Sequence, residues 1–519
     1  MPVISAHTIS ESGKYILMSI RNHKYFLLLV LSWGLSAVLR VPYFQYQFIF
    51  VDEAWWANGA KVLLRGGQLY NDIWLDKNPP IFWFCALLFK IFGINMIAIH
   101  VGSLLLVCII SAVLFKLGTR FFSAGVGAGA ALIYAVASTT YYIPRMIGMN
   151  TETLMVVFTS LAAFSCLLGL AGCRRSGFLA AGLFASFALL TKPVAVTETV
   201  FLVLFVGSAG VGGFRARFRN LVLLATGYAI GFGAFLVYLY RAGMLSAWWE
   251  QAVLFGFRYV NEVSAETFFI KSLRVSLAFV LIFAWLLILI WLSRSMRKPY
   301  LLAYTFVACW LLSAFAGVVL SRRYFASYFI QVMPALSLLG AVGLVYIWNN
   351  RRQARIRLDG KACCAALLVS FAWFHARTLA NWCHLISPPV HQVQQWSMWH
   401  ENQRNLEIAG RLRRGTSAYD RIFIWGSNPE LFFLADRSPA TVWTDYDVMS
   451  GNPPRAGERP MLAQVAATIS RLRPRYVLDA QRMARLETCP ELRGLVEKYY
   501  DLEVEVDGVR LFRLRQGGP

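Results

Sequence analysis

Two adjacent carboxylates, Asp52 and Glu53, follow directly on the first long apolar stretch of the sequence. Charged groups at a membrane boundary are costly to desolvate and usually serve a function. One interpretation is a general base, a positioned side chain that takes the proton from a reacting hydroxyl. The other is a helix N-terminus, where Asp is a common cap and acidic side chains favour the helix dipole. The position alone leaves both interpretations open.

The helices that must position these groups are predicted to lie mostly in a membrane. The chain has 519 residues, of which 58% are hydrophobic and only 15% are charged, whereas soluble proteins carry about a quarter charged residues. The net charge of +23 would suggest nucleic-acid binding in a soluble protein. In a membrane protein, however, basic residues gather in cytoplasmic loops. We therefore expect an integral membrane protein that binds membrane lipid and no nucleic acid.

Apolar stretches of about 20 residues, the length needed to cross a bilayer, predict the transmembrane helices. The stretch 178–208 is too long for one span and is interrupted at Thr191-Lys192-Pro193, so we interpret it as two short spans that meet near Lys192. The fold class is then a polytopic α-helical membrane protein with about eleven transmembrane helices. The other spans are expected near 25–44, 95–115, 124–143, 153–170, 220–240, 272–292, 300–320, 325–347 and 362–380.

Charge asymmetry orients these spans. With residues 1–24 as a cytoplasmic N-terminus, every predicted inner loop carries two or more arginines or lysines, and the only acids in the inner segments are Glu11 and Asp359. This pattern follows the positive-inside rule. A single span over 178–208 would instead place the basic loop 215–219 outside, which favours the two short spans.

The predicted domains are a transmembrane domain at 25–384 and an extracytoplasmic C-terminal domain at 385–519. The first outer loop, about 45–94, contains two predicted interfacial helices at 53–65 and 79–92. The C-terminal domain is expected to be a small α/β domain, because strand-like segments alternate with helical patterns. Its strands are predicted at 421–425 and 475–479, followed by a hairpin that turns at Asp507-Gly508.

A longer motif surrounds the two carboxylates. Residues 52–72 follow the pattern D-E-x5-G-A-x3-L-x2-G-x2-Y-x-D, and Asp76, Lys77 and Pro79-Pro80 come after it. This motif resembles the protein O-mannosyltransferase-like branch of the GT-C glycosyltransferases. That branch includes the aminoarabinose transferase of lipid A and the galacturonosyltransferases of lipopolysaccharide core. The segments 145–158 and 322–336 agree with the resemblance, which covers most of the membrane domain.

The resemblance implies a GT-C-like fold and an inverting glycosyltransferase. Its donor would be a polyprenyl-phosphate sugar, and transfer would take place at the outer face of a bacterial-type inner (plasma) membrane. The expected acceptor is the hydroxyl of a lipid-linked or cell-envelope glycan, and a protein side chain stays open as an alternative. Asp52 would be the general base, and Glu53 would support it by orienting the acceptor or the loop. Tyr70, Asp72 and Asp76 would belong to the substrate loop.

The leaving phosphate of such a donor requires cationic stabilisation. The candidates are the cations on the predicted outer side of the membrane domain, each of which could instead lie among lipid headgroups: Lys77, Arg145, Lys192, Arg258, Arg322 and Arg323. Two positions depart from the family pattern, since Asn78 replaces the lysine that usually precedes the prolines and Ser327 replaces a frequent histidine. Some relatives hold a divalent metal at the position of Asp76. No cofactor is therefore assigned here, and a metal stays open.

An alternative function is that of a multi-span transporter or lipid flippase, which also combines many spans with ionisable residues. Such proteins often contain inverted repeats, whereas here the ionisable groups gather in one outer loop and no second copy of the loop is found. Glycosyl transfer is therefore the favoured hypothesis. A non-catalytic assembly factor would be favoured if Asp52 proved dispensable.

Overall fold

The structure is a computed structural model that describes residues 24–141, 143–209, 213–261, 263–386, 397–444, 459–480, 486 and 489–515. The chain forms two compact units, each assembled from segments that are distant in the sequence. We name them the helical unit and the sheet unit. The helical unit consists of the described residues within Met1–Gln45, His100–Tyr238 and Phe257–Ser387, and the sheet unit of those within Tyr46–Ile99, Leu239–Gly256 and Pro388–Pro519.

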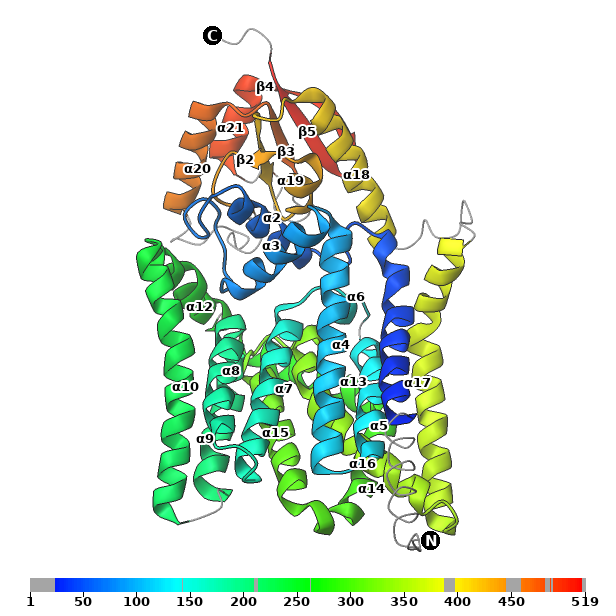
Figure 1. The fold of residues 1–519 in the computed structure, drawn as a ribbon. Coiled ribbons are helices and arrows are strands. Elements are labelled where there is room, and N and C mark those ends of the chain that lie inside the picture. The colour runs from blue at the N-terminus through cyan, green and yellow to red at the C-terminus, as the bar shows by residue number, and fades with distance from the viewer. Residues whose placement is uncertain are drawn as a thin grey trace, which may run out of the picture. The chain divides into compact units, whose positions relative to one another are not determined.

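The helical unit is a bundle whose long helices run side by side (Figure 1). Within the described residues, seven helices are long and apolar enough to cross a membrane, and the bent pair α13–α14 would make an eighth. The shorter α5, α8 and α9 match the remaining predicted spans. After a first helix at 24–40, the bundle consists of α4 (Met96–Phe121), α5 (Ala124–Thr140), α7 (Thr151–Leu170), α8 (Ser176–Thr191), α9 (Val196–Ala209), α10 (Phe214–Arg241), α13 (Ala265–Ile282), α14 (Ala284–Ser293), α15 (Leu301–Leu320), α16 (Met333–Asn349) and α17 (Ala354–Ile386).

The predicted interruption of 178–208 is confirmed. Helix α8 ends at Thr191, Lys192 has an extended backbone (φ −150°, ψ 123°), and Pro193 begins the short helix η2 (Pro193–Ala195) that leads into α9. Proline suits this position, because a backbone N–H in the first turn of a helix has no acceptor within the helix and proline lacks this N–H.

A second interruption was not predicted. The stretch 272–292 was expected to be one span, but α13 and α14 bend by 72° relative to each other. The bend lies at Phe283, whose backbone (φ −99°, ψ 19°) leaves the helical region. A continuous apolar stretch therefore does not guarantee a straight helix.

Helices α8 and α10 approach each other through a pair of glycines. A Cβ atom on Gly182 would lie 1.9 Å from the carbonyl oxygen of Leu224, and one on Gly227 would lie 1.9 Å from that of Leu179. Neither position has room for a side chain. Small residues that allow such backbone contact are typical of helix pairs in membranes.

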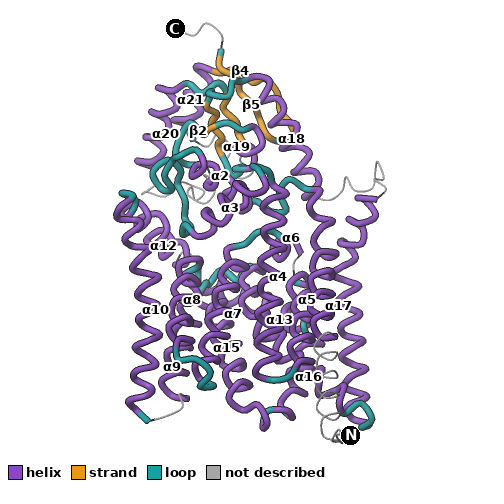
Figure 2. Tube along the Cα trace, viewed as in Figure 1, coloured by secondary structure: helices purple, strands orange, loops and turns teal. Residues whose placement is uncertain are grey.

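The sheet unit contains a five-stranded sheet with the order β2-β1-β3-β5-β4. Strand β1 pairs in parallel with β2 and β3, and β5 pairs antiparallel with β3 and β4. Figure 2 shows these strands with helices beside them. The strands expected at 421–425 and 475–479 and the C-terminal hairpin are confirmed. The bounds are β1 (Arg421–Trp425), β2 (Ser438–Pro439), β3 (Tyr476–Asp479), β4 (Tyr500–Val506) and β5 (Val509–Leu514).

Both faces of this sheet are covered by helices, because successive side chains of a strand point to opposite faces. Phe423 and Trp425 pack in one core with α20 (Arg459–Leu472) and α21 (Pro490–Tyr499). Ile422 and Ile424 pack in the other core with α18 (Ser397–Gly415) and α19 (Glu430–Ala435). The strand RIFIW is therefore apolar on both faces.

The two helices predicted in the first loop are confirmed as α2 (Asp52–Leu64) and α3 (Pro80–Phe92). Most of α2 is buried, and it packs against both α3 and α19. Helix α3 exposes the apolar side chains Leu87, Ile91 and Phe92, which suits the predicted position in a membrane interface. The domain limits 25–384 and 385–519 stay predictions, but the loop groups with the segments after residue 388.

Candidate active site

Helix α2 buries one of its two carboxylates fully and the other only partly. Glu53 is fully buried, and its Oε2 accepts a hydrogen bond from the backbone N–H of Ile49 at 2.8 Å. Asp52 is partly buried at the first position of the helix, and the cap residue is Val51, which makes no side-chain cap hydrogen bond. Glu53 thus fixes the chain that enters α2. Asp52 is not the helix cap, but both carboxylates lie in the first turn of α2, where they favour the helix dipole, so the helix N-terminus interpretation also agrees with the structure.

The loop after α2 is shaped by Tyr70. Its backbone has a positive φ of 68°, which is uncommon for a residue other than glycine. The Tyr70 hydroxyl donates a hydrogen bond to the carbonyl oxygen of Lys77 at 2.7 Å, and the Tyr70 carbonyl accepts one from Gln251 Nε2 at 2.8 Å. Gln251 Oε1 also accepts from the N–H of Leu75 at 3.0 Å. These hydrogen bonds therefore hold the Tyr70 backbone in its strained conformation.

Gln251 was missed by the sequence analysis. It lies on the π-helix η3 (Trp249–Leu254), and π-helical turns occur frequently at functional sites. Asp72 has a comparable local role, because its Oδ2 accepts a hydrogen bond from the backbone N–H of Gln68 at 2.7 Å. The hydrogen bonds of Tyr70 and Asp72 thus give the predicted substrate loop its shape.

Asp76 and Lys77 form an ion pair with each other, and Lys77 Nζ also lies 5.9 Å from the ring centre of Trp55. Asn78, which replaces the usual lysine, is buried, and its Oδ1 accepts a hydrogen bond from Trp248 Nε1 at 2.8 Å. Asn78, directly before the two prolines, therefore has a structural role as a hydrogen-bond acceptor. The positive charge of the loop is displaced to Lys77.

The described residues form no cluster of metal ligands that includes Asp76. Its Oδ1 is buried without a hydrogen-bond partner and its Oδ2 pairs with Lys77. No group of three His, Cys, Asp or Glu side chains comes together in the part of the chain that the structure describes. We therefore derive no step through a metal.

The helical unit brings Lys192 into a polar cluster with Glu152. Lys192 Nζ lies 2.6 Å from Glu152 Oε1, and both side chains are largely buried. Lys192 also lies 3.8 Å from the ring centre of Tyr328. Glu152 Oε2 accepts a hydrogen bond from Thr151 Oγ1 at 2.9 Å. Ser327, at the position where relatives often carry a histidine, is buried on the helix η6 (Ala326–Val332), which packs against α7.

Three arginines of this unit lie in or against residues 321–328. Arg145 lies 4.9 Å from the ring centre of Phe325, which packs edge-on against Tyr328. Arg323 donates to the carbonyl oxygen of Tyr259 and lies 3.5 Å from its ring centre. The segment thus gathers arginine and lysine around aromatic rings, an arrangement favoured by cation–π attraction.

Arg322 donates to the carbonyl oxygen of Val263 at 3.1 Å. Arg322 and Tyr324 have positive φ values of 55° and 50°, and such backbone strain clusters at functional sites. Arg258, by contrast, is exposed on α12 (Phe255–Asn261). The structure therefore gathers Arg145, Lys192, Arg322 and Arg323 around one segment, but does not bring Arg258 into the contacts described for them.

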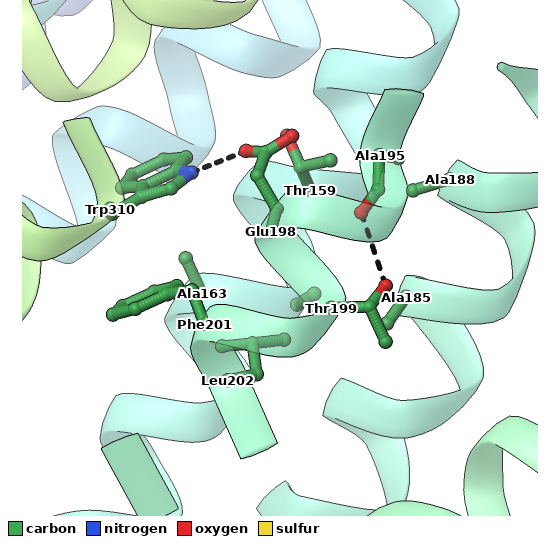
Figure 3. A pocket seen from close by; sticks show the side chains of 11 residues that line it. Thr159, Ala163, Ala185, Ala188, Ala195, Glu198, Thr199, Phe201, Leu202 and Trp310 are labelled. Carbon is green, nitrogen blue, oxygen red and sulfur yellow. Dashed lines mark hydrogen bonds between the residues drawn. The ribbon is translucent and has the colours of Figure 1, made fainter. Parts of the chain in front are cut away.

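Two buried glutamates were missed in the sequence. Glu152 stands at the start of one predicted span, and Glu198 lies within the apolar stretch 178–208. Glu198 Oε1 accepts a hydrogen bond from Trp310 Nε1 at 2.6 Å, and Figure 3 shows its carboxylate beside Thr159 in a small pocket. An ionisable residue in an apolar span is costly, and that signal could have singled out both.

The predicted site residues are divided between the two units. The sheet unit contains Asp52, Glu53, Tyr70, Asp72, Asp76 and Lys77, and the helical unit contains Arg145, Lys192, Arg258, Arg322 and Arg323.

Comparisons with known proteins agree on the fold. Residues 76–241 match the family model described as dolichyl-phosphate-mannose-protein mannosyltransferase. No curated protein matches the chain by sequence. A solved structure of ArnT from Cupriavidus metallidurans bound to undecaprenyl phosphate is similar with a TM-score of 0.65. The two chains are 14% identical, over 98% of this chain and 99% of that one.

An oligosaccharyltransferase from Archaeoglobus fulgidus, in a complex with Zn and sulfate, is similar with a TM-score of 0.54. It is 13% identical to this chain, and the match covers 91% of this chain and 71% of that one. At these identities the structural likeness shows the fold. The resemblance to GT-C glycosyltransferases that the motif indicated is confirmed.

Proposed function

We propose that this chain, which is of the GT-C glycosyltransferase type by its fold and its family match, transfers a sugar from a polyprenyl-phosphate donor to an acceptor hydroxyl. The reaction would invert the configuration at the sugar C1. The acceptor would be a lipid-linked or cell-envelope glycan.

The observation that carries this proposal is the cluster of cations around residues 321–328. Arg145 packs on the ring of Phe325. Arg323 packs on the ring of Tyr259 and donates to the carbonyl oxygen of the same residue. Negative charge that develops on a leaving phosphate is stabilised by such preorganised cations. The similar ArnT structure was solved with undecaprenyl phosphate bound, which supports a donor of the same class.

Asp52 is the proposed general base. It would take the proton of the acceptor hydroxyl while that oxygen attacks C1 from the face opposite the phosphate, and the phosphate would leave with the bonding electrons. Glu53 would contribute indirectly, because its hydrogen bond to Ile49 fixes the start of α2. A positioned base of this kind accounts for about 10²–10⁴ in rate.

The proposed location is a bacterial-type inner membrane, with the N-terminus in the cytoplasm and the C-terminal domain outside. The basic residues of the predicted inner loops support this orientation. A polyprenyl-phosphate donor would reach the protein from the bilayer itself, so the reaction would require no nucleotide-binding site.

The test is sugar transfer by the purified full-length protein in nanodiscs, using polyprenyl-phosphate sugars and a panel of membrane lipid extracts. Asp52→Asn should fold normally and lose about 10²–10⁴ in transfer rate. The control is Glu250→Gln, which removes an exposed carboxylate of the same unit and should leave the rate unchanged. Equal transfer by wild type and Asp52→Asn would remove the assignment of the base.

A further inference from the structure

A cavity of about 690 Å³ lies within the sheet unit, and neither Asp52 nor any cation of the proposed phosphate site lines it. Helix α2 and the loop after it form one wall, residues 438–444 at the edge of the sheet form another, and α20 contributes a third. The volume falls in the range of about 300–1,000 Å³ that is typical of small-molecule sites. The cavity is therefore large enough for a short saccharide.

The walls are joined by specific contacts. Lys61 Nζ and Arg65 Nη2 lie 2.5 and 2.7 Å from the same oxygen of Asp436. The Asn58 side chain donates to the carbonyl oxygen of Pro429 at 2.9 Å. The N–H of Trp74 donates to the carbonyl oxygen of Val442 at 2.8 Å. The cavity is thus built into the packing of α2 and its loop against the C-terminal segments.

The lining is strongly basic. Among its described residues the only carboxylate is that of Asp72, which is already bonded to the backbone of the loop. Arg421 and Arg471 are exposed, and no ion pair joins either of them to another described residue. The other basic residues of the lining are Lys61, Arg65 and Arg437.

Arg437 adds a positive charge that no described carboxylate compensates. Its guanidinium donates to the Thr416 hydroxyl at 2.7 Å, to the Thr416 carbonyl at 2.9 Å and to the Ala435 carbonyl at 3.1 Å. Asp436 is shared by Lys61 and Arg65. Positive charge therefore exceeds negative charge among the described residues around the cavity, which favours an anionic ligand.

Neutral groups of the lining suit a sugar. Trp443 contributes a partly buried indole, whose face can pack on a pyranose ring. Gln464 and Thr468 of α20 contribute an amide and a hydroxyl. Sugars are recognised by such combinations of an apolar face with hydrogen-bonding groups.

We propose that this cavity binds an anionic saccharide, a short glycan that carries a phosphate or a carboxylate. The planar guanidinium groups of Arg421 and Arg471 would bind its oxyanion, a geometry in which arginine can make two parallel hydrogen bonds. Calling this glycan the acceptor of the transfer reaction rests on the proposed function, whereas the binding itself does not.

The test is direct binding to the full-length protein in nanodiscs, without donor, by isothermal titration calorimetry. The probes are neutral mannotriose, phosphorylated mannotriose, trigalacturonic acid and inorganic phosphate. At least one charged trisaccharide should bind about tenfold more tightly than mannotriose, and the better of the two tells phosphate from carboxylate. The double variant Arg421→Gln/Arg471→Gln should weaken that probe by about tenfold.

Two further variants make the test specific. Arg411→Gln removes a partly exposed arginine of α18 that does not line the cavity and should leave the affinity unchanged. Trp443→Leu should weaken the charged trisaccharide severalfold without changing the binding of inorganic phosphate. Unchanged affinity of the double variant, equal affinity for mannotriose, or competition by inorganic phosphate as strong as by the trisaccharide would each overturn the proposal.

Failure of the proposed function and failure of the anionic saccharide site would give different experimental results. Asp52 does not line the cavity, so Asp52→Asn should bind the probes as wild type does. A protein that binds the charged trisaccharide but transfers no sugar would refute glycosyl transfer alone. A protein that transfers sugar but does not bind the probes would refute the anionic saccharide site alone.

Discussion

Replacing Lys192 by methionine should both destabilise the helical unit and slow transfer by about 10²–10³. The side chain of Lys192 is 12% exposed and that of Glu152 is 5% exposed, and their charged atoms lie 2.6 Å apart. Removing one partner of a buried pair leaves an uncompensated charge and costs about 3–5 kcal/mol. The contact of Lys192 with the Tyr328 ring adds about 0.5–2 kcal/mol.

The double variant Glu152→Gln/Lys192→Met separates the two effects. Neutralising both members of a buried pair is often close to neutral for stability, so most of the lost stability should return. Transfer should not return, because a cation at a developing phosphate charge contributes about 10²–10³ in rate. The assay combines unfolding midpoints in detergent with initial transfer rates of wild type, each single variant and the double variant.

Two results would refute this reasoning. If the double variant regained transfer, Lys192 would serve only to neutralise Glu152, and the leaving phosphate would be bound by other groups. If Lys192→Met were as stable as wild type, the ion pair with Glu152 would contribute nothing to the helical unit.

Other predictions concern the loop, the pH dependence and the helix contacts. Tyr70→Phe removes the hydrogen bond to the Lys77 carbonyl and should cost about 1 kcal/mol, measured as a lower unfolding midpoint with faster proteolysis of the loop. Burial alone would raise the pKa of Asp436, but the hydrogen bond and charge of Lys61 hold it below its usual value. The stability that ionised Asp436 contributes should therefore be present above about pH 4 and be lost as the pH falls through the lowered pKa. In Asp436→Asn the unfolding midpoint should depend less on pH in this acid range. Gly182→Val places a side chain on the carbonyl oxygen of α10 and should cost more than the roughly 1–3 kcal/mol of ordinary overpacking, measured by the yield and midpoint of folded protein.

The elements with strong local signals were predicted from the sequence. The break at Lys192 follows from the proline next to it, and β1 was recognised from a short β-rich segment bounded by polar residues. The hairpin turn has positive φ values of 51° at Asp507 and 81° at Gly508, which this pair of residues tolerates well. Each of these features depends on a few neighbouring residues.

Features that depend on distant partners could not be predicted in this way. The bend at Phe283 occurs within an evenly apolar stretch that carries no local cue. The sequence can single out Glu152 as a buried acid, but not its partner Lys192, which lies 40 residues further along the chain. The cavity exists because Lys61 meets Asp436, which lies 375 residues further along the chain. Periodicity and composition contain no information about such pairs.

The contact of α2 with the C-terminal segments also determines when α2 can complete its packing during biosynthesis. Asn58 and its partner Pro429 are separated by 371 residues, and translation proceeds at about 5–20 residues per second. A nascent chain would therefore wait roughly 20–70 seconds between the emergence of α2 and that of its partner. During this interval the apolar residues that α2 later buries must be covered by another partner, such as the lipid surface or a chaperone. Deletions at the C-terminus should accordingly expose a segment near the beginning of the chain to quality-control proteases.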